Sequence, residues 1–187
     1  MLRLRYVNIT DIKSGPPFVP ETQTSSTGTP KAAAGAAEVP YDLIELLFFA
    51  YRDFVGDPDR ILADYGFGRA HHRVLHFVQR RPGLTIAELL DILGITKQSL
   101  NRVLKELVET GFVEQRTGTQ DKRQRKLHAT PAGQDLATRL AQLQAKRINA
   151  ALAGLEPGGV ETVAAYLAGL IDPAERRKVL GFLAPRA

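Results

Sequence analysis

Apolar residues recur at the spacing of an α-helix over most of the chain after residue 40. Residues 41–55 are apolar on almost every side, which predicts a helix that is buried both in the core and at a subunit interface. Residues 69–80 carry their apolar side chains on one side only and end at Arg81-Pro82-Gly83. We therefore expect two helices of different character, the first enclosed by apolar surroundings and the second amphipathic.

Two shorter helices joined by a tight turn are predicted next. Thr85 and Glu88, three residues apart, form a capping box that starts the first of them. In the turn Gly94-Ile95-Thr96, glycine is a typical C-terminal stop and threonine is a typical N-cap. The second helix extends to about Thr110, and Gly111 ends it. This arrangement predicts a helix-turn-helix.

After Gly111 the periodicity changes from that of a helix to that of strands. Residues 112–116 and 123–129 are predicted to be two antiparallel strands, with the polar residues 117–122 as the loop between them. The hairpin has a basic tip and follows the helix-turn-helix directly. Together the two motifs predict a winged helix-turn-helix.

Thr130-Pro131 then begins a long helix, with threonine as the N-cap and proline at the first helical position. Two shorter helices are predicted at about 160–170 and from Asp172 onward. The predicted fold is mainly α with a small β-hairpin wing, a winged helix-turn-helix domain plus a helical dimerisation region. Its predicted parts are a disordered or loosely ordered tail (1–38), an N-terminal dimerisation helix region (39–68), a winged helix-turn-helix domain (69–129) and C-terminal helices (130–187).

The net charge of +5 is distributed unevenly along the chain. Residues 69–127 contain twelve Lys and Arg against six Asp and Glu, a net of +6, whereas residues 41–68 have a net charge of −4. A basic segment between less basic ones is typical of a module that binds a polyanion. Charge alone fits a merely solvated basic surface equally well. The placement of individual side chains is therefore needed to choose between polyanion binding and a solvated surface.

The composition narrows the classes of function. The absence of cysteine excludes disulfides, thiolate nucleophiles and cysteine zinc sites. No apolar run is long enough to cross a bilayer and no secretory signal is present, so we expect a cytoplasmic, nucleoid-associated protein with no membrane partner. There is no glycine-rich phosphate loop, nucleophile elbow or recognisable carboxylate pair, so we expect no enzyme, no catalytic residue and no cofactor.

The helix over residues 96–110 is apolar on one side and has an opposite side suited to the major groove of DNA. Base contacts come mostly from the N-terminal half of such a helix. We therefore expect bases to be read by Gln98, Ser99, Asn101 and Arg102. Phosphates are expected to be contacted by Thr96, Lys97 and Lys105. The alternative, a solvated amphipathic helix, is disfavoured by the capped helix before it and the basic hairpin after it.

The hairpin supplies a second set of predicted DNA-binding residues, Asp121, Lys122, Arg123, Arg125 and Lys126. Arg123 lies at the tip and is expected to enter the minor groove, where narrow A·T tracts focus negative potential. Asp121 is expected to orient an arginine or to cap the turn.

Three other groups of residues invite a functional interpretation. Among the histidines His71, His72, His76 and His128, the four-residue spacing of His72 and His76 suits a metal, but two histidines do not complete a site, so we expect none. The acidic residues Asp53, Asp57, Asp59 and Asp64 are expected to cap turns around Gly56-Asp57-Pro58. Phe48, Phe49, Tyr51, Phe67 and Phe77 either line an aromatic effector pocket or, as we prefer, pack in a dimer core.

Residues 84–133 resemble the MarR family of bacterial transcriptional regulators. The resemblance rests on Thr96-Lys97-Gln98-Ser99 at the start of the reading helix and on residues 107–113 leading into the wing. It extends to Asp121-Lys122-Arg123, which matches the family's Asp-x-Arg wing motif, and to the closing Thr130-Pro131-Ala132-Gly133. The family's usual Leu-Thr before the long helix is Ala129-Thr130 here. The order of the helices matches over roughly residues 41–155.

The resemblance implies a homodimer built from the first and last helices, with two wings on a pseudopalindromic double-stranded DNA site. It also implies a repressor that releases DNA when a small, often aromatic or phenolic, effector binds between the dimer region and the reading head. Two other functions remain open: a non-specific architectural DNA-binding protein, which would not distinguish sequences, and a winged helix that binds a protein instead of DNA.

Overall fold

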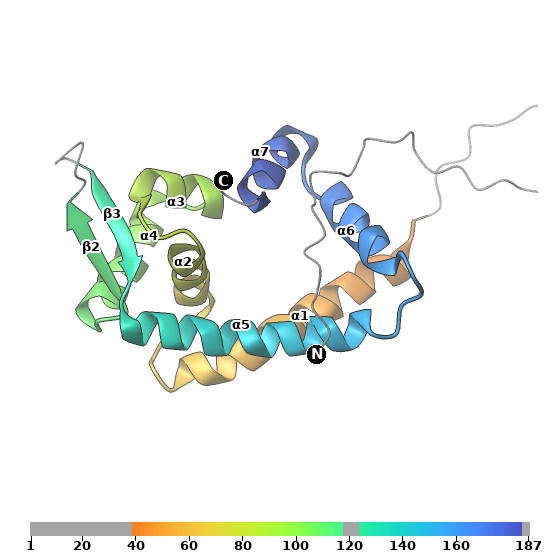
Figure 1. Ribbon diagram of the computed structural model, residues 1–187, viewed down its shortest axis with the longest axis horizontal. Helices are drawn as coiled ribbons and strands as arrows, with labels where there is room; N and C mark the ends of the chain where they lie inside the picture. Colours follow the sequence, from red (N-terminus) through yellow and green to blue (C-terminus); the bar gives the residue numbers. More distant parts are fainter. Residues whose placement is uncertain (1–38, 118–123, 185–187) are drawn as a thin grey trace, which may run out of the picture. The chain divides into compact units, whose positions relative to one another are not determined.

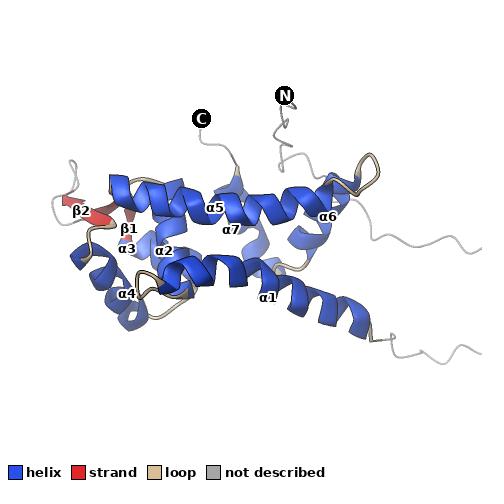
Figure 2. Cartoon of the chain, turned by 90° about the horizontal axis from the view of Figure 1, so that it is seen from below, coloured by secondary structure: helices blue, strands red, loops and turns tan. Residues whose placement is uncertain are grey.

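The computed structural model describes residues 39–117 and 124–184. The described chain divides into two compact units, one comprising Pro40–Ala150 and the other including the residues after Ala150. In the larger unit, helices predominate and the strands are confined to one end (Figure 2). The described helices include none with the length and apolarity that a membrane span requires.

Helix α1 is longer than the sequence pattern indicates. It runs over Tyr41–Ala63, through the Gly56-Asp57-Pro58 segment where turns were expected. Pro58 costs the helix one backbone hydrogen bond. However, Val55, Pro58 and Leu62 form a buried stripe at helical spacing, and their packing holds the helix together across the proline. The expected break is therefore wrong, and three of the four aspartates expected at turns (Asp53, Asp57 and Asp59) lie inside the helix, while Asp64 is its C-cap.

The first half of α1 is exposed in the single chain. Its large apolar side chains between Tyr41 and Tyr51 are 44% to 65% exposed. The expected burial in the intrachain core is wrong for these residues, because the core begins only at Val55. The other half of the expectation, that a second subunit covers them, stays a prediction.

The helix-turn-helix forms as predicted. Helix α2 spans Arg69–Arg80, α3 spans Ile86–Leu93 and α4 spans Lys97–Glu109. The Thr85–Glu88 capping box is present: Glu88 N–H donates to Thr85 Oγ1 (3.2 Å), and Thr85 N–H donates to Glu88 Oε2 (2.8 Å). Gly94 ends α3 in the left-handed conformation with φ of 60°.

The wing is part of a three-stranded antiparallel sheet of order β1-β3-β2. Its hairpin consists of β2, Val113–Thr117, and β3, Arg125–Ala129. The third strand, β1 at Leu84–Thr85, was not predicted, since two residues are too few to show a strand periodicity. Leu84 pairs with Leu127 and Thr85 with Lys126, which joins the start of α3 to the wing.

The core of the larger unit is one apolar cluster. Residues from the end of α1, from α2, α3 and α4, from all three strands and from the first half of α5, Pro131–Leu152, contribute to it. Figure 1 shows α2, α3, α4 and the strands grouped beside the first half of α5. Helix α4 packs with Leu100, Val103, Leu104 and Leu107 inward, which leaves its opposite side exposed.

The two C-terminal helices are confirmed as α6, Gly159–Gly169, and α7, Pro173–Leu183. Asp172 caps α7 by accepting from Ala174 N–H at 2.8 Å. The turn between the two helices is held by Arg176, whose Nη2 donates to the carbonyls of Gly169 (2.8 Å) and Ile171 (3.1 Å). These bonds satisfy carbonyls that the end of α6 leaves open.

Candidate nucleic-acid interface

The exposed side of α4 carries all the residues of this helix that were predicted to contact DNA, those for bases and those for phosphates. These side chains are exposed on or just before the helix: Thr96, Lys97, Gln98, Ser99, Asn101, Arg102 and Lys105. The arrangement follows from the apolar stripe of α4, because burying that stripe turns the polar side outward. The structure thus brings the seven residues together on one open surface, and their contacts with DNA stay a prediction.

The N-terminus of this helix is held by a local network. Thr96 Oγ1 accepts the N–H of Ser99 at 3.2 Å and donates to the Ser99 hydroxyl at 2.9 Å. The cap keeps the first turn of α4 regular, so its remaining N–H groups point out of the helix end toward solvent. One turn before the C-terminus, Lys105 Nζ lies 3.7 Å from Glu109 Oε1, an exposed pair that partly offsets the lysine charge.

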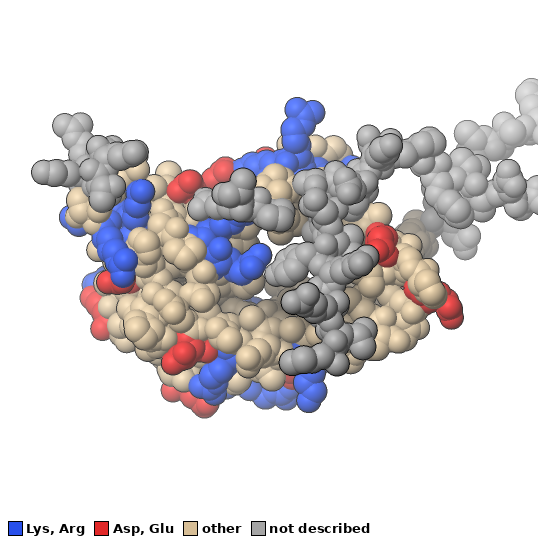
Figure 3. All heavy atoms as spheres, viewed as in Figure 1, with Lys and Arg blue, Asp and Glu red and all other residues tan. Residues whose placement is uncertain are grey.

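The strands of the wing present basic side chains beside α4. Arg125 is exposed and donates from Nη1 to Thr117 Oγ1 at 3.3 Å, and Lys126 is half-buried. Arg116 pairs with Glu114 on the same strand. Figure 3 shows one group of Lys and Arg side chains over the region of β2 and β3, with further groups elsewhere on this face. The predicted tip residues Asp121, Lys122 and Arg123 lie outside the described residues.

A joint between the C-terminus of α4 and the start of α5 was not predicted from the sequence. Gly111, with φ of 78°, turns the chain out of the helix, and Thr130 N–H donates to Phe112 O at 3.1 Å. A Cβ added to Gly133 would lie 2.0 Å from that same oxygen. The signal was a glycine inside the predicted helix after Thr130, since such a glycine is unfavourable unless a close contact requires it.

The four histidines lie on α2 and β3. The described residues include no group of three or more potential metal ligands. The rings of His72 and His76 have centroids 6.5 Å apart on α2. Burial lowers the pKa of His72, and burial together with nearby Arg80 lowers the pKa of His76. Both rings therefore favour the neutral form.

The five aromatic candidates are divided among separate places. Phe48 and Phe49 form an edge-to-face pair on the exposed part of α1, where Tyr51 is also exposed. Phe67 belongs to the core, and Phe77 packs against His76 with ring centroids 5.1 Å apart. The structure therefore does not bring these residues together into one aromatic pocket.

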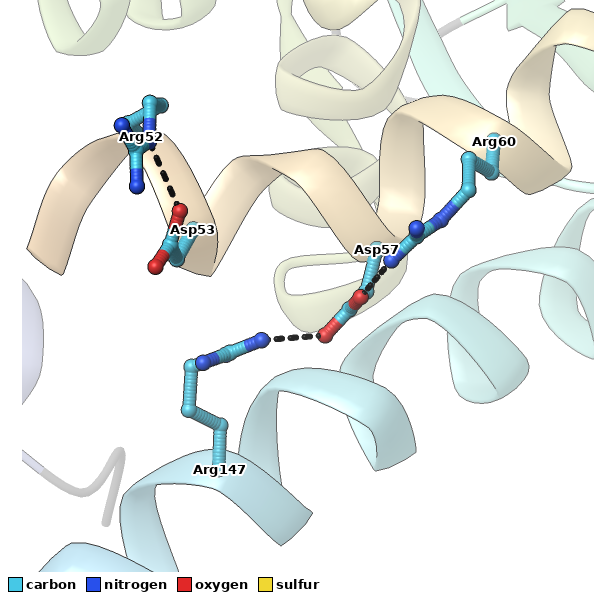
Figure 4. A network of polar contacts seen from close by, with 5 residues as sticks. All are labelled: Arg52, Asp53, Asp57, Arg60 and Arg147. Atoms are coloured by element: carbon cyan, nitrogen blue, oxygen red, sulfur yellow. Dashed lines mark hydrogen bonds and ion pairs between the residues drawn. The ribbon is translucent and has the colours of Figure 1, made fainter. Parts of the chain in front are cut away.

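A polar cavity of about 450 Å³ lies between α1, the start of α2 and α5. Its lining is Arg52, Asp53, Gly56, Asp57, Arg60, Arg69 and Arg147. Asp57 is its central acceptor, since Arg147 Nη2 donates to it at 2.8 Å from α5 and Arg60 pairs with it from α1 (Figure 4). These two arginines hold the pKa of Asp57 below its usual range, and Arg52 does the same for the pKa of Asp53.

Comparison with known proteins settles the family. A family model described as the MarR family matches residues 65–124. The HTH-type transcriptional regulator PetP of Rhodobacter capsulatus is 50% identical over 134 residues, which are 72% of this chain and 81% of PetP. The chain belongs to the MarR family. It is a transcriptional regulator of that family, as the resemblance of residues 84–133 predicted.

Solved structures of similar fold include the transcriptional regulator SlyA, with a TM-score of 0.59 and 18% identity over 75% of this chain and 95% of SlyA. MarR has a TM-score of 0.57 and 19% identity over 79% of this chain and 98% of MarR. Streptococcus pneumoniae FabT, solved in complex with DNA, has a TM-score of 0.62 and 16% identity over 70% of this chain and 93% of FabT. At these identities the likeness concerns the fold, and it confirms the predicted mainly helical winged helix-turn-helix.

Proposed function

We propose that this MarR-family protein is a sequence-specific DNA-binding regulator that binds a pseudopalindromic operator as a homodimer. The observation that carries the proposal is the exposed side of α4, where Gln98, Asn101 and Arg102 stand together on a helix whose apolar side is buried. Amide and guanidinium groups at this spacing can donate to and accept from base edges in the major groove. The helix-turn-helix and the adjacent basic strands support the same mode of binding.

The exposed apolar half of α1 supports a homodimer. A water-soluble monomer rarely exposes so many large apolar side chains on one helix, and two copies of one surface can cover each other about a twofold axis. A dimer would place two copies of α4 on the two halves of an inverted repeat. We expect the protein to sediment as a dimer in the absence of DNA.

Repression that a small effector relieves is the regulatory mode that we infer from family membership. The expected effector is a small, often aromatic or phenolic, compound rather than a resident cofactor. The cavity between α1, α2 and α5 supports its binding, because four arginines face two aspartates in its lining and this excess of positive charge favours a compound that also carries a carboxylate. Such a carboxylate would compete with Asp53 and Asp57 for the arginines that already pair with them. The proposed place of action is the bacterial cytoplasm, on the chromosome.

The test is selection of bound duplexes from a random DNA pool with the purified full-length protein. We expect an enriched inverted repeat with a fixed half-site spacing and a steep salt dependence of its affinity. Recovery of DNA without an enriched motif would favour the non-specific architectural protein. No recovery at low salt would contradict DNA binding and favour a protein-binding winged helix. Aromatic carboxylates can then be screened for release of the selected duplex.

A further inference from the structure

His71 is a buried residue of α2 whose ring makes two hydrogen bonds. Gly68 N–H, at the N-cap of α2, donates to His71 Nδ1 at 3.1 Å. His71 Nε2 lies 2.6 Å from Oε2 of Glu106, on α4. Because an accepting Nδ1 carries no proton, the proton of the neutral ring is on Nε2, which donates to the carboxylate.

The two bonds act on different elements. One side of the imidazole closes the first turn of α2, in the manner of a capping box, and the other side holds the third turn of the reading helix. The ring is itself held by Phe67, which stacks on it with centroids 4.7 Å apart and an interplanar angle of 11°. The stacking therefore fixes the direction in which the Nε2–H group of His71 points toward Glu106.

The apolar packing of α4 does not fix the rotation of the helix about its own axis. Contacts of Leu100, Val103, Leu104 and Leu107 hold the helix against the core, but hydrophobic contact has no preferred direction. A short, charge-assisted hydrogen bond is directional and resists rotation of the helix about its axis. Glu106 lies one turn after Arg102, so fixing its angle also fixes the angle at which Arg102 leaves the helix.

We propose that His71 and Glu106 are positioning residues for DNA reading, which set the rotation of α4 against α2. The proposal rests on the proposed function, DNA binding by α4. Glu106 would thus favour DNA binding through its hydrogen bond to His71, although a negative charge near phosphates by itself weakens binding.

Two substitutions at Glu106 separate the hydrogen bond from the charge. E106A removes both the carboxylate charge and the acceptor for His71, whereas E106Q removes the charge and keeps an acceptor oxygen. E109A is the matched control, since Glu109 is an exposed acid on the same helix whose partner, Lys105, is also on α4. H71N is the second probe: its shorter side chain keeps an acceptor near Gly68 and ends short of Glu106.

The experiment measures the affinity of each full-length variant for two probes, the duplex selected by the wild-type protein and a random duplex of equal length, with thermal unfolding as a check on folding. We expect E106A and H71N each to weaken binding to the selected duplex about tenfold. Binding to the random duplex should be unchanged or tighter. E106Q and E109A should not weaken either complex. The double variant E106A/H71N should lose no more than either single variant, because both break one bond.

Three outcomes would overturn the inference. The first is that E106A behaves as E109A does, which would leave only the effect of charge. The second is that E106A weakens both complexes equally, which would indicate a general loss of structure. The third is that the losses of E106A and H71N add in the double variant. If the wild-type protein bound neither duplex at low salt, the proposed function itself would fail, a result distinct from these three.

Discussion

The hydroxyl of Thr130 donates a hydrogen bond of 2.6 Å to the carbonyl oxygen of Gly111. The same hydroxyl accepts the N–H of Gly133 at 3.1 Å, so it also caps α5. Gly111 is the residue that turns the chain out of the reading helix. The bond thus attaches the start of the long helix α5 to the end of α4.

We expect T130V to destabilise the protein by about 1–2 kcal/mol, because it removes the cap of α5 and leaves the Gly111 carbonyl without its partner. T130S keeps the hydroxyl and should cost less than half as much. Urea unfolding of the full-length protein followed by circular dichroism measures both values. A T130S protein that loses as much stability as T130V would show that the methyl group of Thr130 contributes as much as its hydroxyl, and would contradict the expected dominance of the hydrogen bonds.

Gly133 should tolerate no side chain. In G133A the new Cβ would lie 2.0 Å from the backbone oxygen of Phe112, so the start of α5 must move away from the turn after α4. A loss of about 3 kcal/mol in the free energy of unfolding is expected. G181A in α7 is the control, since a Cβ there meets nothing within 4 Å and should be neutral or slightly stabilising. A G133A protein as stable as the wild type would contradict this account.

Arg102 is expected to read a base. R102A should weaken binding to the selected duplex by about 10- to 100-fold and should relax the preference for one base pair in each half-site. K105A, which removes a predicted phosphate contact, should weaken the selected and random duplexes alike and lower the salt slope by about one. Selections repeated with both variants measure the difference. An unaltered motif for R102A would exclude the proposed base contact.

His72 and His76 should make stability depend on pH. Burial lowers the pKa of each below its usual value of 6.5, so the unfolded chain takes up protons before the folded chain does. The free energy of unfolding should therefore fall as the pH drops below 6.5 and should level off below the folded pKa values. In the double variant H72Q/H76Q this part of the slope should disappear. Urea unfolding at intervals from pH 8 to pH 4 tests it, and identical profiles would refute the assignment.

Asp57 should contribute stability only where it is ionised. Arg147 and Arg60 lower its pKa in the folded state, so its contribution is complete above the unfolded value and is lost as the pH falls through the folded pKa. The wild-type protein should thus lose stability as the pH falls into the acid range, whereas D57N should already lack this stability at neutral pH. Because the pair is exposed, 1 M NaCl should reduce the difference between the two proteins at neutral pH. Parallel pH profiles for wild type and D57N would show that the pair contributes nothing.

Most of the elements could be predicted because their signals are local. The Thr85–Glu88 box, the Gly94 stop and the Thr96 cap each act within one turn of a helix, and all three form as the sequence indicates. The amphipathic pattern of α4 likewise determined which of its side chains face outward. Such signals depend on a few neighbouring residues, so they can be interpreted without knowing what the chain packs against.

Only the tertiary structure decided how distant residues meet. Burial of Val55 and Leu62 carried α1 across Pro58, against the local tendency of proline to break a helix. His71 meets Glu106 across 35 residues, and Arg147 meets Asp57 across 90. Apolar patterning requires that these helices pack. It does not determine the rotation of each helix about its axis or which polar side chains become partners, because hydrophobic contact is not directional. Polar partners therefore emerge only once the packing has placed the helices.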